Sequence, residues 1–176
     1  MPPICFYSIE FLKNYEGIND RNSESKEDNI VKGDEKMDTN HSIITIEATV
    51  HAPIEKVWEY WTVPAHITKW NNASDEWHTP YAENDLKAGG KFVSRMEAKD
   101  GSFGFDFGGI YDEVRTHEFI SYKLEDGRKV QITFIAEEND TKVVEVFEAE
   151  TANPIEMQQE GWQAILDNFK RHAEQQ

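Results

Sequence analysis

The stretch NPIEMQQEGWQAILDNFKRHAEQQ, residues 153–176, decides the fold of this chain. Asn153 can accept a hydrogen bond from a free backbone N–H at a helix start, Pro154 suits the first helical position, and Glu156 completes a capping-box pattern. Apolar side chains then recur at helical spacing along one face: Met157, Trp162, Ile165, Leu166, Phe169 and Ala173. Because a terminal helix cannot bury this stripe against itself, it requires a sheet to pack on.

The chain before this helix supplies that sheet. Alternating apolar and polar residues from Ile44 to Val50 predict a half-buried first strand. Pro53 and Pro64 each open a predicted short helix. Six further strands are expected, near 77–81 and at 91–98, 103–114, 119–124, 129–136 and 142–149. The turns KDGS and EDGR are hairpin signals, and such short connections imply an antiparallel meander.

These elements predict a fold of the α+β class. We expect a curved antiparallel sheet of about six or seven strands, wrapped around a long C-terminal helix, with two short helices after the first strand. Gly108 and Gly109 predict a bulge that bends the sheet around this helix. Gly161 costs about 1 kcal/mol relative to Ala in mid-helix. We attribute it to tight packing, with close approach of a ligand as the alternative.

Residues 1–42 differ in composition from the rest of the chain. From Asn19 to His41 they are almost wholly polar and cannot bury enough surface to offset the entropy of ordering. We predict a disordered or loosely docked extension, followed by a folded domain over residues 43–176. Met37 precedes the first strand and is a candidate for the natural start; a short regulatory tail that docks on the domain is the alternative.

The amino-acid composition limits the classes of molecule that this chain is expected to bind. With 18 basic and 34 acidic residues the net charge is −16, which repels phosphate backbones and anionic lipid, so we expect neither nucleic acid nor membrane as a partner. No apolar run approaches the roughly 20 residues of a membrane helix, and the beginning of the chain does not read as a signal peptide. The single cysteine, Cys5, excludes an intramolecular disulfide and fits a reducing cytoplasm.

Motifs for metal, phosphate or nucleophilic chemistry are missing from the sequence. The six histidines form no HExxH or H-x-H pattern, and one cysteine cannot make a zinc motif. Neither a GxSxG elbow nor a P-loop occurs. We therefore expect no metal and no cofactor, and assign no catalytic residue.

Five stretches, taken together and in order, carry a resemblance to a known family: ATVHAPIEKVWEYWT (48–62), WHTPYAENDLKAGGKF (77–92), MEAKDGSFGFDFGGIYDEV (96–114), ISYKLEDGRKVQITF (120–134) and EMQQEGWQAILDNFK (156–170). The chain resembles the START-like (SRPBCC) superfamily with its helix-grip fold. More narrowly, it resembles the bacterial family named after the C-terminal domain of the activator of the 90-kDa heat-shock chaperone ATPase. The resemblance implies a cavity between the C-terminal helix and the concave sheet, where superfamily relatives bind apolar small molecules and some cyclise or hydrolyse them.

On this resemblance, the expected ligand-binding residues lie on the inner faces of sheet and helix and at the cavity mouth: Trp70, Trp77, His78, Phe92, Met96, Phe105, Phe107, Tyr122, Phe134, Glu145, Trp162, Leu166 and Phe169. Trp70, Trp77 and His78 are placed at the mouth, and the others in the walls. The alternative for these residues is ordinary core packing, and for His78 it is a position on the surface.

The polar candidates include Glu145, Asp106, Tyr111 and Arg128. Valines or other apolar residues flank Glu145 on both strand faces, so alternation does not choose its direction. If Glu145 points inward, burial raises its pKa and makes it the best acid/base or ligand-anchoring group. Arg128 follows a turn and is expected to pair at the surface.

Three functions follow as hypotheses. The first is binding of a small apolar molecule, lipid-like or aromatic, with a weak homodimer left open. The second is a cyclase- or hydrolase-type enzyme that uses the same cavity, with Glu145, Asp106 or His78 as acid/base. The third is regulation of the heat-shock chaperone ATPase, which the family name suggests.

Overall fold

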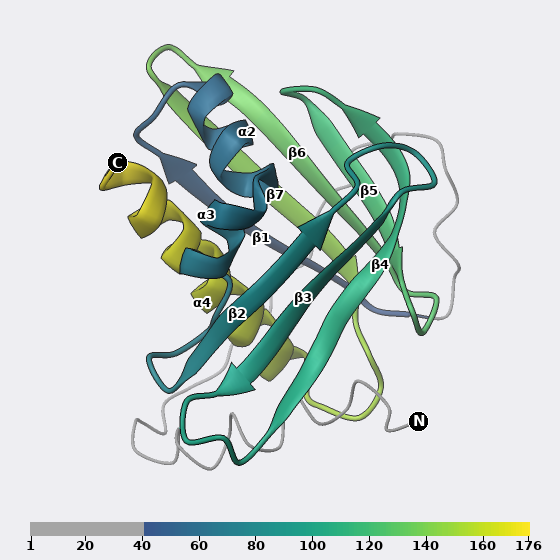
Figure 1. The fold of residues 1–176 in the computed structure, drawn as a ribbon. Helices are drawn as coiled ribbons and strands as arrows, with labels where there is room; N and C mark the ends of the chain where they lie inside the picture. The colour runs from purple at the N-terminus through teal and green to yellow at the C-terminus, as the bar shows by residue number, and fades with distance from the viewer. Residues whose placement is uncertain (1–40) are drawn as a thin grey trace, which may run out of the picture.

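The computed structural model describes residues 41–176, in which three helices and seven strands are formed (Figure 1). Residues 1–40, which include Met37 and almost all of the predicted extension, lie outside the described residues. The elements in chain order are β1 (Ile43–Val50), α2 (Ile54–Thr62), α3 (Pro64–Trp70), β2 (Trp77–Asn84), β3 (Lys91–Ala98), β4 (Gly104–Arg115), β5 (Phe119–Leu124), β6 (Lys129–Glu137), β7 (Asp140–Glu148) and α4 (Ile155–Glu174).

The strands form one antiparallel sheet in the order β1-β7-β6-β5-β4-β3-β2. Strands β2 to β7 are therefore a meander, as predicted, and β1 joins the sheet beside β7. Gly101 and Gly127 adopt positive φ values of 75° and 88° in the two predicted Asp-Gly turns, a conformation that glycine reaches without steric cost. The α+β class is confirmed.

The helices lie on one side of the curled sheet (Figure 1). Helix α4 packs on β1 and also contacts α2 and α3, whereas α3 packs on β2, the opposite edge strand. The helices thus span the two edges of the sheet. Phe147 of β7 and Phe169 of α4 are fully buried between these layers. The apolar stripe of α4 therefore packs against the sheet, as its spacing predicted.

Two local predictions are wrong. Helix α4 has Pro154 at its N-cap and no side-chain cap, and the Asn153 amide donates to Glu150 Oε1. The bulge predicted at Gly108–Gly109 is displaced, since the sheet register shifts between Tyr111 and Glu113.

The glycine pair in β4 permits a close approach instead. A Cβ on Gly109 would lie 2.4 Å from the Lys123 carbonyl oxygen and 3.0 Å from the Phe92 ring. A Cβ on Gly108 would lie 2.8 Å from the Phe92 carbonyl oxygen. Backbone at these distances cannot give way cheaply, so the two positions admit only glycine for reasons of space.

None of the helices in the described part of the chain is long and apolar enough to cross a membrane.

Candidate functional site

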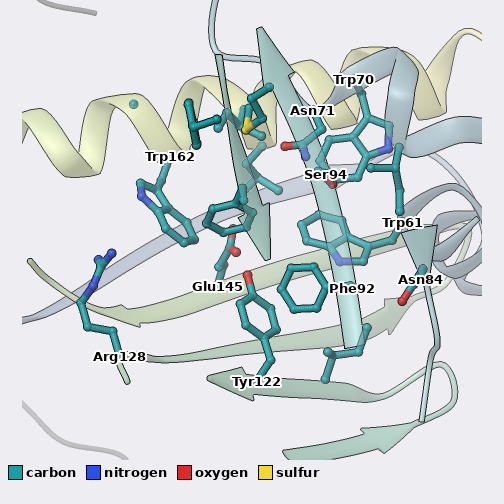
Figure 2. A pocket seen from close by; sticks show the side chains of 18 of the residues that line it. Trp61, Trp70, Asn71, Asn84, Phe92, Ser94, Tyr122, Arg128, Glu145 and Trp162 are labelled. Atoms are coloured by element: carbon teal, nitrogen blue, oxygen red, sulfur yellow. The ribbon is translucent and has the colours of Figure 1, made fainter. Parts of the chain in front are cut away.

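A partly enclosed cavity of about 140 Å³ lies between α4, α3 and the sheet (Figure 2). Most of its wall is aromatic or aliphatic: Trp61, Ile67, Trp70, Phe92, Met96, Phe105, Phe107, Tyr111, Ile120, Tyr122, Met157, Trp162, Ile165 and Leu166. Polar groups enter the wall at a few points: Asn71, Glu83, Asn84, Ser94, Arg128, Glu145, Glu150 and Gln158. This composition is typical of small-molecule sites, in which an apolar surface carries a few orienting groups.

Most of the residues predicted to bind a ligand come together in this wall: Trp70, Phe92, Met96, Phe105, Phe107, Tyr122, Glu145, Trp162 and Leu166. Phe92, Ser94 and Met96 alternate along β3, so their side chains share its inner face. Their position is now established by the fold, whereas contact with a ligand stays a prediction.

The other four predicted residues do not line the cavity. Phe134 packs edge-on against Trp58 and Trp61, with ring centroids 5.2 and 5.7 Å apart. Phe169 packs on Trp61 and Trp70 and is fully buried. Both belong to the core: the inward stripe of α4 carries Phe169 past the end of the cavity, and Phe134 of β6 packs on the same Trp61.

Trp77 and His78 lie at the far end of β2. Trp77 is paired in register with Ala98, beyond Met96 on β3, and its ring lies against Phe103 and Phe105. His78 is paired with Glu97 on the opposite face, and its side chain is 43% exposed. Residue alternation on β3 thus explains why His78 is a surface histidine.

Gly161 was misinterpreted from the sequence. It is buried and lines the cavity, yet a Cβ added there would meet no atom within 4 Å. Tight packing therefore does not explain this glycine, which leaves open space beside the helix. Trp61 and Ile67 also line the cavity, and neither is among the residues predicted to bind a ligand.

Glu145 points inward, a direction that alternation along β7 could not choose. It is 6% exposed and lies on the inner strand face between Val143 and Phe147. Its register neighbours on β1 and β6 are Ile46 and Ile132, so apolar side chains flank it on both sides. In this environment desolvation raises the pKa of the Glu145 carboxyl to about 8.

The Glu145 carboxyl accepts no hydrogen bond from any group among residues 41–176. Figure 2 shows it in the middle of the cavity, with the Tyr122 hydroxyl on the same side. Burial first, and the neighbouring Glu145 second, raise the pKa of Tyr122 well above its ordinary value. Both groups are therefore largely uncharged at neutral pH.

A hydrogen-bonded chain closes the other end of the wall. The Tyr111 hydroxyl donates to Asn84 Oδ1 at 2.7 Å, and Asn84 Nδ2 donates to the Thr62 carbonyl at 2.6 Å. Burial raises the pKa of Tyr111 well above its ordinary range. These groups satisfy one another and hold β2, β4 and α2 in place.

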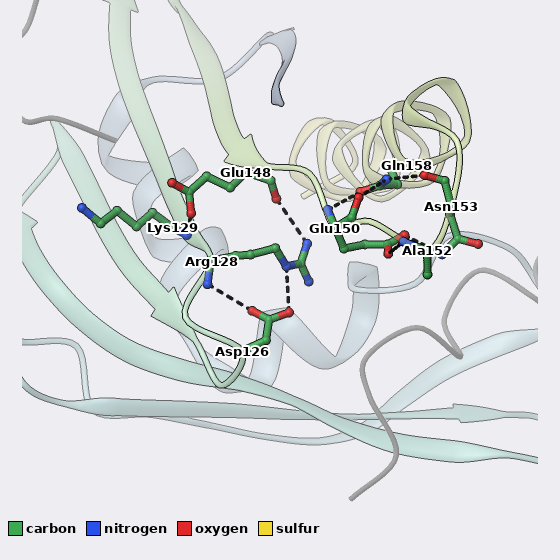
Figure 3. A network of polar contacts seen from close by, with 8 residues as sticks. All are labelled: Asp126, Arg128, Lys129, Glu148, Glu150, Ala152, Asn153 and Gln158. Atoms are coloured by element: carbon green, nitrogen blue, oxygen red, sulfur yellow. Dashed lines mark hydrogen bonds and ion pairs between the residues drawn. The ribbon is translucent and has the colours of Figure 1, made fainter. Parts of the chain in front are cut away.

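Arg128 is buried at 5% exposure, so the predicted surface position is wrong. Its Nε donates to Asp126 Oδ2 at 2.7 Å, and its Nη1 donates to the Glu148 carbonyl at 3.2 Å (Figure 3). The turn that was expected to expose Arg128 instead folds Asp126 back over it. The guanidinium forms part of the cavity wall with its charge balanced by that carboxylate.

The second polar cluster in Figure 3 joins the start of α4 to the end of β7. The Gln158 side chain accepts from the Glu150 backbone N–H at 2.9 Å and donates to the Asn153 carbonyl at 2.8 Å. Gln158 thereby satisfies backbone groups of the loop that leads from β7 into α4.

The acid/base candidates are reduced to one. The Asp106 side chain is 63% exposed and pairs with Arg95, and His78 lies on the surface. Acid–base chemistry in the cavity would therefore depend on Glu145 with Tyr122. In the described part of the chain, no group of three or more His, Cys, Asp or Glu side chains is placed to hold a metal ion.

Similarity to known proteins agrees with this architecture. A family model described as Activator of Hsp90 ATPase homolog 1-like protein matches residues 51–174. The solution structure of the AHSA1-like protein from Aeromonas hydrophila superposes with a TM-score of 0.73, at 46% identity, over 76% of this chain and 93% of that one. The solution structure of a protein from Cytophaga hutchinsonii gives a TM-score of 0.66 at 58% identity, over 75% of this chain and 92% of that one.

A crystal structure of a Chromobacterium violaceum protein shares the fold, with a TM-score of 0.66 at 24% identity, over 76% of this chain and 98% of that one. No curated protein has a significantly similar sequence.

Proposed function

The chain belongs to the family of Activator of Hsp90 ATPase homolog 1-like proteins, and on this premise we propose that it binds a small, compact apolar molecule in the cavity between α4 and the sheet. The ligand is aromatic in character, and binding does not require a metal or cofactor.

The observation that carries this proposal is the cavity itself. Its volume of about 140 Å³ is close to the roughly 150 Å³ of an apolar cavity that takes up benzene. A single ring with a short substituent matches this space, whereas an extended lipid chain would need the walls to move. The aromatic surfaces of Trp61, Trp70 and Trp162 support an aromatic guest, because ring pairs contribute about 0.5–1.5 kcal/mol beyond their buried area.

Toluene and indole are the probes for the experiment. Each is titrated into the ¹⁵N-labelled full chain, and the indole N–H signals are followed by NMR. The signals of Trp61, Trp70 and Trp162 should shift and saturate, whereas that of Trp58, which packs on Phe134 outside the cavity, should move less.

A cavity-filling variant provides the specific control. Gly161→Leu places a side chain in the open space beside α4, so it should abolish the saturable shifts. Gln159→Leu adds the same side chain at an exposed position of α4 and should leave binding unchanged. The proposal is wrong if neither probe binds to the native chain, or if Gly161→Leu binds both probes as the native chain does while remaining folded.

A cytoplasmic location completes the proposal. It is supported by the single cysteine in 176 residues, and cell fractionation with an antibody to the chain would test it.

A further inference from the structure

We infer that the molecule bound in this cavity carries one cationic amine on its compact aromatic body, and that the Glu145 carboxylate pairs with this amine. The inference rests on the proposed binding function and specifies the chemical class of its ligand.

The first support is the isolation of Glu145. Buried polar groups in proteins are nearly always hydrogen-bonded, because an unpaired one costs free energy. Only 6% of the Glu145 surface is exposed. The side chain faces the cavity and has no hydrogen-bond donor among residues 41–176. A donor on the ligand would satisfy it. A cationic donor does so best, because charge-assisted hydrogen bonds are roughly twice as strong as neutral ones.

The second support is the sign of the charge around the cavity. Glu83 and Glu150 line it beside Glu145, against the guanidinium of Arg128. The charge of Arg128 is already matched by Asp126 at 2.7 Å, and a further donor of Arg128 is used by the Glu148 carbonyl. The net charge of the chain is −16, which adds to the attraction for a cation. An anionic ligand would meet the opposite field.

The third support is the aromatic surface beside the carboxyl. Trp162 of α4 stacks on Phe147 with a centroid separation of 4.0 Å, and Phe147 lies two residues from Glu145 on the same strand face. Figure 2 places Trp162, Tyr122 and Phe92 around Glu145. Aromatic faces attract cations, most strongly the indole of Trp, and desolvation increases this attraction.

Ligands of other chemical classes should show a different dependence of binding affinity on pH. Glu145, with a pKa of about 8, is mostly protonated at pH 6.5 and mostly ionised at pH 8.5. A cationic amine needs the ionised form, so each binding event at low pH releases one proton from Glu145 to the buffer. A neutral hydroxyl or carbonyl ligand instead accepts a hydrogen bond from the protonated form and binds more weakly at high pH. The other titratable side chains of the wall are Glu83, Glu150, Tyr111, Tyr122 and Arg128, and the pKa values of both tyrosines are raised further above this range.

The experiment compares four one-ring probes that differ in one substituent: toluene, benzyl alcohol, benzylamine and benzoate. Their dissociation constants for the full chain are measured by NMR titration at pH 6.5 and 8.5, together with proton release by calorimetry in two buffers. Benzylamine should bind the most tightly at pH 8.5. Its affinity relative to toluene should fall roughly 20-fold at pH 6.5, following the ionised fraction of Glu145.

The matched variant is Glu145→Gln, which keeps the shape of the side chain but cannot ionise. It should lose both the preference for benzylamine over toluene and the pH dependence of that preference. A native-like NMR spectrum shows that the variant is folded; the pH dependence of the native chain tests the inference independently of the variant.

The outcomes separate the two proposals. Binding of none of the four probes overturns the proposed function itself. Binding of toluene without a preference for benzylamine at pH 8.5 overturns only the amine inference. Tighter binding of benzyl alcohol at pH 6.5 would indicate a neutral acceptor ligand, and tighter binding of benzoate an anion held by Arg128; either result rejects the amine.

Discussion

Replacing Glu145 by Gln should remove a large pH dependence from the stability of this protein. The folded state raises the pKa of this carboxyl from 4.5 to about 8 by desolvation, so the folded chain holds its proton more tightly than the unfolded chain does. Stability from this group is therefore fully present below pH 4.5 and is lost as the pH rises toward 8, with no further change above that value. At about 1.4 kcal/mol per pH unit, the whole interval corresponds to roughly 5 kcal/mol.

Urea denaturation of the native chain and the Glu145→Gln variant at pH 5, 6, 7, 8 and 9 measures this effect. The free energy of unfolding of the native chain minus that of the variant should become roughly 4 kcal/mol more negative from pH 5 to pH 8 and then stay constant. Taking the difference cancels the titration of His172, which changes stability in the opposite direction.

Glu137→Gln serves as the control, because Glu137 is an exposed carboxyl at the end of β6. Its difference from the native chain should stay flat over the same range. A difference for Glu145→Gln that is equally flat would refute the buried acid, and with it the inward orientation of this side chain.

Four further substitutions test other parts of the structure. Gly161→Ala should raise the free energy of unfolding, measured in urea, by about 1 kcal/mol, because Ala favours the helix and the added methyl group meets no atom. It should also weaken toluene binding by narrowing the cavity. Unchanged stability would contradict the assignment of open space at this position. Phe169→Ala should lower stability by about 3–5 kcal/mol in the same assay, since this fully buried ring packs on two indoles, and a loss below 1 kcal/mol would contradict its place in the core. Arg128→Met should lower stability by about 1–3 kcal/mol because a buried carbonyl loses its donor, measured by thermal unfolding, and an unchanged midpoint would speak against that bond. The pKa of His172 is lowered by desolvation and by the nearby His66, so the unfolded chain takes up a proton at higher pH than the folded chain. The free energy of unfolding should therefore fall as the pH drops below about 6.5. His172→Gln should reduce this fall in acid titrations followed by circular dichroism.

The elements of the fold were predictable because their signals are local. The Asp-Gly turns fix tight hairpins over a few residues, and the strands 91–98 and 119–124 were predicted with the bounds that the structure has. The stripe on α4 specifies one apolar face by its spacing alone. Antiparallel order then follows from the short connections between successive strands.

The site was only partly predictable, because its members depend on which residues lie opposite one another. Glu145 has apolar neighbours on both strand faces, so its direction was decided by the register of β7 between β1 and β6. Arg128 looked like a surface residue, but a carboxylate two residues earlier and a carbonyl of β7 bury it.

The sequence by itself therefore determined the element types, their order and the family, since backbone propensity and residue period act over short distances. The tertiary structure alone decided where core ends and cavity begins. On α4, Phe169 fills its space completely, whereas Gly161, two turns earlier, leaves its space open. That difference arises from the distance between α4 and the curved sheet at each point, and no local pattern of residues encodes this distance.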